Sequence, residues 1–163
     1  MTGATDPSLA AELVRRLHDD QEARRAWITT DDGAGRMLAA DRDNARWLRE
    51  VLCRHGWPGT GLVGTTGAEA AWMLAQHADH DVVFQRQCLE LLIEAVDRGE
   101  APRPHVAYLA DRVLRKRGDL QRYGTQYRAG RSGLELCPSQ EPWGLAERRA
   151  AMGLPAADTV PPG

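Results

Sequence analysis

The chain has 163 residues, of which 42% are hydrophobic and 27% are charged, a composition typical of a soluble globular protein of one domain. A formal net charge of −2 and the lack of any long block of like charges argue against nucleic-acid binding. No stretch approaches 18 consecutive apolar residues and the first residues are polar, so we expect a cytoplasmic protein that does not bind membranes.

The three cysteines, Cys53, Cys88 and Cys137, are odd in number, widely spaced and form no Cys-x-x-Cys pair. This spacing argues against a disulfide framework and against a zinc knuckle. The glycine-rich segment 60–67 lacks the Gly-Lys-Ser/Thr of a phosphate-binding loop. We therefore expect the protein to work without a cofactor and without a metal.

Apolar residues recur every three to four positions along most of the chain, which predicts helices. A first helix opens at Pro7, and Trp27 and Ile28 are expected to continue its apolar stripe. Residues 60–66 are predicted to form a loop, with Thr66 as the N-cap of the third helix. The second to fifth helices are expected at about residues 36–55, 66–77, 81–98 and 105–117.

The remainder of the chain is expected to be irregular over 121–133, extended over 134–142, and helical again at about 145–152. No run of alternating strands is present, so we expect no sheet larger than a two-strand ribbon. The sequence therefore predicts an all-α fold, a single compact bundle of about five helices with an irregular C-terminal segment. The predicted domain spans 1–153, and 154–163 is predicted to be a disordered tail.

Polar residues interrupt the apolar faces of the second and third helices. Asp41 and Asn44 share a face with Leu48 and Val51 because of their spacing of three and four. Asp41 could serve as an acid/base, or it could bond a loop backbone or an arginine. His77 lies on the inner face of the third helix, where it could be a general base or a satisfied core histidine.

A second polar group lies on the fifth helix and in the segment that follows it. Asp111 and Arg112 could form an internal ion pair that anchors the next loop, or an acid/base with an anion clamp. The segment 121–126 collects donors and acceptors around one glycine, and could close over a ligand or bond back into the helices. Trp57 could line a pocket wall or act as a packing lid.

Several short motifs follow one another along most of the chain. They are, in order, Asp41…Asn44, Gly56-Trp57-Pro58, Gly64, Gln76-His77-Ala78-Asp79, Gln85, Asp111-Arg112-Val113 and Tyr123-Gly124-Thr125-Gln126. This order resembles a bacterial family known only as a domain of unknown function. The resemblance covers about Asp20 to Gly153 and implies a stand-alone helical domain, but it implies no catalytic residues.

These observations favour a small, cofactor-independent enzyme that acts on a small-molecule substrate by general acid/base chemistry. Hydrolysis, elimination or cyclisation of a small polar metabolite fits the residues present. One alternative is a non-catalytic protein- or peptide-binding helical module, and another is a metal-dependent hydrolase that uses His77, His80 and an aspartate. The oligomeric state is not predicted. The candidate catalytic residues are His77, Asp111 and Asp41, and the candidate substrate-binding residues are Arg112, Tyr123, Gln126, Asn44, Gln76 and Trp57.

Overall fold

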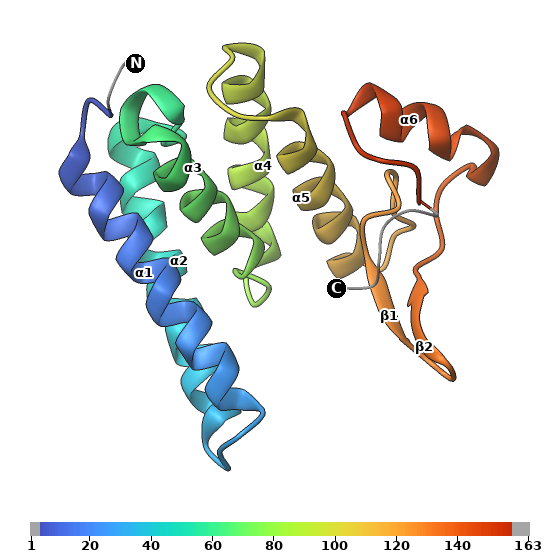
Figure 1. Ribbon diagram of the computed structural model, residues 1–163, viewed down its shortest axis with the longest axis horizontal. Coiled ribbons are helices and arrows are strands. Elements are labelled where there is room, and N and C mark those ends of the chain that lie inside the picture. The colour runs from blue at the N-terminus through green and yellow to red at the C-terminus, as the bar shows by residue number, and fades with distance from the viewer. Residues whose placement is uncertain (1–3, 158–163) are drawn as a thin grey trace. The chain divides into compact units, whose positions relative to one another are not determined.

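The computed structural model describes residues 4–157 and confirms the predicted all-α class (Figure 1). The chain packs as two compact units, Met1–Ala101 and Pro102–Gly163, and each is described by itself. The first unit contains α1 (Pro7–Trp27), α2 (Gly33–His55), α3 (Thr60–Gln76) and α4 (Val82–Asp97). The second contains α5 (Arg103–Lys116), the strands β1 (Tyr127–Gly130) and β2 (Gly133–Leu136), the 3-10 turn η1 (Pro142–Gly144) and α6 (Leu145–Ala151).

The core of the first unit forms where α1 packs against α2 and α3. Figure 1 shows α1 and α2 side by side as a long hairpin. Leu13, Leu48 and Leu74, one from each helix, are at most 1% exposed, and α4 adds Phe84 and Leu92. Fully burying one such side chain stabilises a fold by about 1.5–3 kcal/mol, so this apolar contact dominates the packing of the unit.

Side-chain caps define where two of these helices begin. The Asp6 carboxylate accepts a hydrogen bond from the backbone N–H of Leu9 at 2.9 Å, and Pro7 occupies the first helical turn, as expected from the sequence. In the same way Asp81 accepts from the N–H of Phe84 at 2.9 Å and starts α4. Each cap satisfies a donor that the helix itself leaves unpaired.

The prediction of a loop over residues 60–66 was wrong. Helical structure already begins at Thr60, and only Gly64 breaks it, with φ 72° and ψ 172°. The first turn is stabilised from outside, because the Glu100 carboxylate accepts from the N–H of Gly61 at 2.6 Å. Gly64 reaches positive φ without a steric cost, so a kink replaces the expected loop.

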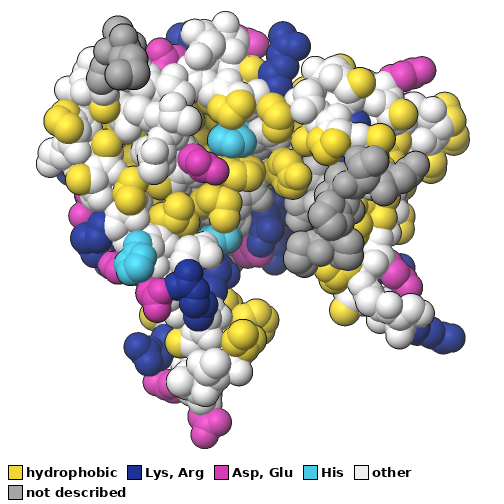
Figure 2. All heavy atoms as spheres, viewed as in Figure 1, with side chains coloured by type: hydrophobic (Ala, Val, Ile, Leu, Met, Phe, Trp, Pro, Cys, Tyr) yellow, Lys and Arg dark blue, Asp and Glu magenta, His cyan; other side chains and the backbone are white. Residues whose placement is uncertain are grey.

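Trp27 and Ile28 do not continue the apolar stripe of α1, contrary to the prediction. Their exposed fractions are 53% and 81%, and α1 ends at Trp27. Charged side chains of both signs gather over the α1–α2 hairpin on the face shown in Figure 2. They include ion pairs such as Arg15–Asp19 at 2.6 Å, and each exposed pair is worth only about 0–1 kcal/mol.

The second unit contains the two-strand ribbon that the sequence allowed. Tyr127 pairs with Leu136 and Gly130 pairs with Gly133 in an antiparallel register. The first strand lies inside the segment predicted to be irregular, because its four residues lack the apolar alternation by which strands are recognised.

The end of the described chain folds back onto the second unit. Leu154, at the start of the expected disordered tail, is buried, and residues 158–163 of that tail lie outside the described residues. The single-domain boundary at 153 stays a prediction. Within residues 4–157, the helices are too short or too polar to cross a membrane.

The close approach of Glu100 to α3 predicts that Gly59→Ala destabilises the protein. A Cβ at Gly59 would lie 2.6 Å from the Glu100 Cβ and 2.9 Å from its carbonyl oxygen, which accepts from the N–H of Thr60. We expect a loss of about 1–3 kcal/mol in the free energy of unfolding, the usual cost of overpacking. Gly35→Ala in α2 is the control, since nothing lies within 4 Å of its Cβ and alanine favours a helix by about 0.5–1 kcal/mol. Urea unfolding that finds the two variants equally stable would contradict this contact.

Candidate functional site

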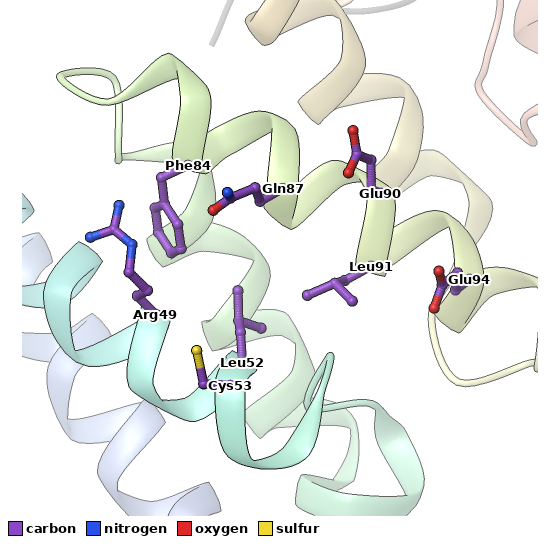
Figure 3. A pocket seen from close by; sticks show the side chains of 8 residues that line it. All are labelled: Arg49, Leu52, Cys53, Phe84, Gln87, Glu90, Leu91 and Glu94. Carbon is purple, nitrogen blue, oxygen red and sulfur yellow. The ribbon is translucent and has the colours of Figure 1, made fainter.

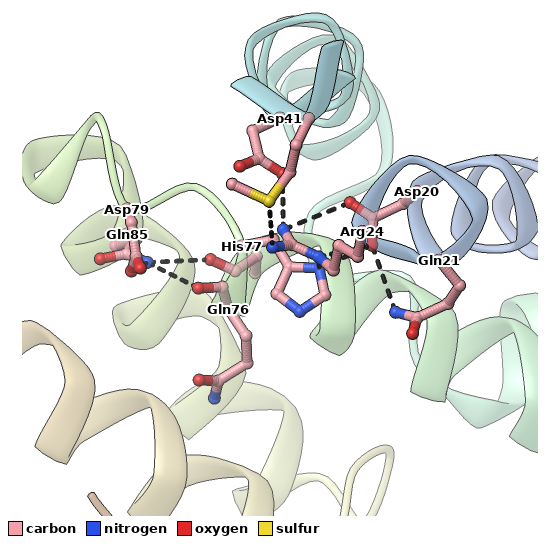
Figure 4. A network of polar contacts seen from close by, with 10 residues as sticks. Asp20, Gln21, Arg24, Asp41, Gln76, His77, Asp79 and Gln85 are labelled. Carbon is pink, nitrogen blue, oxygen red and sulfur yellow. Dashed lines mark hydrogen bonds and ion pairs between the residues drawn. The ribbon is translucent and has the colours of Figure 1, made fainter. Parts of the chain in front are cut away.

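Three helices of the first unit bring Asp20, Arg24, Asp41 and His77 together, and we call these four residues the buried polar cluster (Figure 4). Asp20 and Arg24 come from α1, Asp41 comes from α2, and His77 is the C-cap of α3. Asp20 is 1% exposed and Asp41 is 7% exposed. Carboxylates are rarely buried without a partner, so the contacts within the cluster decide what it can do.

The sequence reasoning anticipated His77 and Asp41 but missed Asp20 and Arg24. Leu13, Leu17, Asp20 and Arg24 follow one another at spacings of four, three and four, so they lie on one face of α1. This is the same signal that identified Asp41 on α2, whose predicted face of Asp41, Asn44, Leu48 and Val51 is confirmed as buried.

The shortest contact of the His77 imidazole is with the Asp20 carboxylate. The His77 Nδ1 lies 2.8 Å from the Asp20 Oδ2, and the Arg24 Nε lies 3.1 Å from both atoms. Nδ1 cannot donate to the carboxylate and accept from the guanidinium at once. A lone pair that faced a carboxylate at this distance would be repelled, so we assign the proton to Nδ1. Nε2 then carries the free lone pair.

The free edge of the imidazole points away from the cluster. Figure 4 shows Nδ1 toward Asp20 and Arg24 and the other ring nitrogen on the far side. Nε2 has no hydrogen bond to the residues in the described range, and 12% of the His77 side chain is exposed. A histidine held at one nitrogen by a buried carboxylate, with the other nitrogen free, has the arrangement of a general acid or base.

Arg24 is the central cation of the cluster. Its Nη2 donates to the Asp41 Oδ1 at 2.6 Å, and its Nη1 lies 3.4 Å from the Met37 Sδ. Asp41 therefore bonds an arginine, one of the roles that the sequence left open. With both carboxylates ionised and a neutral imidazole, the formal charges of the cluster are two negative and one positive.

The pKa values of the Asp20 and Asp41 carboxyl groups are shifted in opposite directions. Burial alone raises the pKa of Asp20, but the hydrogen bond and charge of His77 and the charge of Arg24 outweigh it and lower the pKa below its ordinary value. For Asp41, burial raises the pKa above its ordinary value, and the nearby Asp20 charge adds to this rise against the opposing effect of Arg24. Neighbouring acids with separated pKa values are a common feature of acid/base sites.

The cluster also has the residue types of a metal site. Ligand atoms of Asp20, Asp41 and His77 lie within 4.8 Å of one another, whereas His80, which the metal alternative required, is exposed in the turn before α4. The Arg24 guanidinium contacts all three candidate ligands. It supplies the positive charge that a metal ion would otherwise bring, and a metal would have to displace it.

The other candidates in the first unit lie apart from this contact network. The Asn44 Oδ1 accepts from the Arg16 Nη1 at 3.1 Å, and Asn44 lines a pocket of about 150 Å³ that also reaches Asp20. Trp57 is buried and lines a separate pocket of about 400 Å³. Gln76 is buried, and its carbonyl oxygen accepts from Gln85.

Asp111 anchors the loop that follows α5. Its fully buried carboxylate accepts from the backbone N–H groups of Arg122, Tyr123 and Thr125 at 2.7–3.1 Å, and from the Thr125 hydroxyl at 2.9 Å. The sequence left two roles open for Asp111, an ion pair with Arg112 that anchors the next loop and an acid/base with an anion clamp. The charge of Asp111 is instead distributed over donors of the loop itself.

Two further buried side chains complete this loop. Gln121 donates to the carbonyl oxygens of Gln126 at 3.1 Å and Cys137 at 2.6 Å, and accepts from the N–H of Gln126 at 2.8 Å. Arg149 of α6 donates to the carbonyl oxygens of Tyr123 at 2.8 Å and Gly124 at 2.7 Å. Sequence reasoning missed Arg149, because no pattern distinguishes it from the exposed arginines of short helices.

The candidate residues thus fall into two groups. Asp41, Asn44, Trp57, Gln76 and His77 belong to the first unit. Their substrate-binding roles stay predictions. The second group consists of Asp111, Arg112, Tyr123 and Gln126.

A groove of about 390 Å³ between α2 and α4 contains none of these candidates (Figure 3). Leu52, Phe84 and Leu91 contribute its apolar surface. Arg49, on its edge, is paired with Asp81 at 2.8 Å and stacks on Phe84. The groove lacks a base held by a second group, which the buried polar cluster has, so the cluster is the better candidate site.

Comparison with known proteins adds one finding. A family model described as "Family of unknown function (DUF6624)" matches residues 7–160, nearly the whole chain. This confirms the resemblance stated from the sequence. No curated protein and no solved structure matches the chain.

The opposite pKa shifts in the cluster predict different costs for two similar substitutions. Asp20→Asn breaks the buried contact with His77 and Arg24, and we expect it to lower the free energy of unfolding at neutral pH by about 3 kcal/mol. Asp41→Asn replaces a carboxyl that retains its proton more readily, and we expect a loss of about 1 kcal/mol.

The pH dependence follows from the signs of the shifts. The lowered pKa of Asp20 gives stability that is present above the ordinary carboxyl pKa and is lost as the pH falls through the folded-state pKa. The raised pKa of Asp41 gives stability that is lost as the pH rises through its folded-state pKa. The difference in stability loss between Asp20→Asn and Asp41→Asn should therefore be smaller at about pH 3 than at neutral pH. Urea unfolding at both pH values measures it, and equal losses at neutral pH would contradict the assignment.

The anchoring role of Asp111 predicts a structural cost. Asp111→Asn keeps one acceptor oxygen but loses the charge and half of the accepting capacity for the four donors. We expect a loss of about 3 kcal/mol or more in the free energy of unfolding, since hydrogen bonds to a charged group are worth about 1.5–3 kcal/mol each. The control is Asp119→Asn, an exposed carboxylate near the end of α5, which should change stability by less than about 0.5 kcal/mol. A thermal melt of Asp111→Asn that matches this control would show that the loop does not depend on Asp111.

Proposed function

We propose an enzymatic role for this chain, which belongs to the DUF6624 family of unknown function. The proposed activity is cofactor-independent general acid/base catalysis on a small polar metabolite, with His77 as the group that transfers the proton. The observation that carries the proposal is the 2.8 Å contact between the His77 Nδ1 and the buried Asp20 carboxylate, which leaves Nε2 free.

Asp20 supports this role in two ways. Its carboxylate holds the imidazole in the tautomer with a free Nε2, and its charge stabilises the imidazolium that forms when Nε2 takes a proton. In this proposal Asp20, which was not among the sequence candidates, is the partner of His77. Asp111 is not needed as an acid/base, because its carboxylate accepts from the donors of its own loop.

Arg24 has two functions in the proposed site. Its guanidinium is the positive charge that lies beside the buried Asp20 and Asp41 carboxylates. Arg24 also holds both carboxylates in place, which limits the reorganisation that accompanies proton transfer.

The reaction class follows from what one positioned base can do. Removing a proton from water, from a hydroxyl group or from a carbon next to a carbonyl leads to hydrolysis, cyclisation or elimination. The same imidazolium can return the proton to the leaving group. These reactions need no electron transfer, and no redox motif is present in the sequence.

The proposal can be tested by incubating the protein, before and after treatment with a chelator, with a defined mixture of polar metabolites. Mass spectrometry then follows the conversion of each metabolite. The mixture should include esters, lactones, amides and hydroxy acids. We expect His77→Gln to lower the rate at least about a hundredfold, the usual effect of losing a general acid or base. Asp20→Asn should lower it by a similar factor or more, because the imidazole loses its orientation.

Glu22→Gln is the control for Asp20→Asn, since Glu22 is an exposed acidic residue of α1 that lines none of the pockets described above. Its rate should stay within about twofold of the unmodified protein, as for surface substitutions away from a site. Conversion by folded His77→Gln at the unmodified rate would contradict the proposal. Conversion by the untreated protein that disappears after chelator treatment would favour the metal-dependent alternative.

A further inference from the structure

We propose that Gln85 is a positioning residue for His77, an inference that rests on the proposed function of the cluster. Gln85 lies on α4, one turn after the helix begins, and is fully buried. It contacts neither Asp20 nor Arg24 in the described contacts of the cluster. Its action on His77 is through the backbone at the end of α3.

The two N–H groups of the Gln85 amide face three acceptors in this segment. Its Nε2 lies 3.0 Å from the Gln76 carbonyl oxygen, 3.3 Å from the Ala75 carbonyl oxygen and 3.1 Å from the Asp79 Oδ1. Figure 4 shows dashed lines from Gln85 to carbonyl oxygens beside His77, on the opposite side of the histidine from Asp20. Three acceptors therefore converge on a single amide nitrogen.

The contact with Gln76 fixes the peptide that carries His77. The Gln76 carbonyl belongs to the peptide unit that joins Gln76 to His77, and the N–H of the same unit donates to the Met73 carbonyl at 3.1 Å. The plane is thus held at both of its polar groups. Because His77 is the C-cap of α3, the last carbonyls of the helix have no partner within it, and Gln85 supplies one from outside.

The other end of the Gln85 side chain indicates why a glutamine is present. Its Oε1 is buried and has no hydrogen-bond partner among the residues that the structure describes. A buried acceptor without a partner lowers stability, and methionine would fill a similar volume without this penalty. The hydrogen bonds that the Gln85 Nε2 donates therefore explain why an amide side chain is present at this position. They hold the turn from which His77 reaches Asp20.

The proton on the His77 Nδ1 gives a spectroscopic test that needs no substrate. In the unmodified protein we expect a downfield proton resonance for this N–H, bonded to a buried carboxylate, and His77→Gln should remove it. Gln85→Met should speed its exchange with water by at least about tenfold, because the released turn lets the imidazole leave Asp20 more often. The control is Gln87→Met, the same change at an exposed glutamine of α4, which should leave the resonance unchanged.

A milder variant covers the case in which Gln85→Met does not fold. Gln85→Asn keeps a buried amide but is one methylene shorter, so it cannot reach all three acceptors, and we expect intermediate exchange. Unchanged exchange in either folded variant overturns the role of Gln85 and leaves the proposed function untouched. Absence of the resonance from the unmodified protein contradicts the Asp20–His77 pair itself, and with it the proposed function.

Discussion

The guanidinium of Arg24 makes the contacts on which the buried polar cluster of the first unit depends. It bonds Asp20 on its own helix and Asp41 on α2, and it touches the imidazole at the end of α3. Two buried carboxylates without this cation would each be desolvated and would repel one another, at a cost of several kcal/mol. One arginine therefore allows polar side chains from three helices to be buried next to one another. The same contacts hold the Asp20 carboxylate against the His77 Nδ1, which is the basis of the proposed chemistry at His77.

The second unit uses charged side chains differently, to replace secondary structure. The loop 121–126 has neither helix nor ladder bonds for most of its backbone, so buried side chains supply the partners. Asp111 accepts from its N–H groups, while Arg149 donates to its carbonyl oxygens. The negative carboxylate thus pairs with backbone N–H groups, and the positive guanidinium pairs with backbone carbonyl groups. A strongly polar sequence motif can in this way be a folding requirement, because each buried peptide group needs a partner.

Helical structure was largely predictable from the chain, because periodicity and caps are local. Pro7 and the apolar spacing of α2 and α4 act within a few residues, and the all-α class followed from them. The errors fell where a distant group intervenes. Glu100 stabilises the first turn of α3, and this contact cannot be read from residues 60–66 alone. Gly64 provides the positive φ at the kink. The first strand of the ribbon was missed for a related reason, since its pairing with β2 rather than its own pattern makes it a strand.

For the candidate site, the sequence by itself determined which side chains are out of place on apolar faces, since helical spacing decides which residues share a face. This placed Asp41 and His77 on the buried side, and the same rule applies to Asp20 and Arg24. Only the tertiary structure decided which of these groups meet, because the spacing along one helix holds no information about the helix packed against it. The partner of a buried charge is chosen by packing, and that choice determines whether a carboxylate orients a base, as Asp20 does, or holds a loop, as Asp111 does.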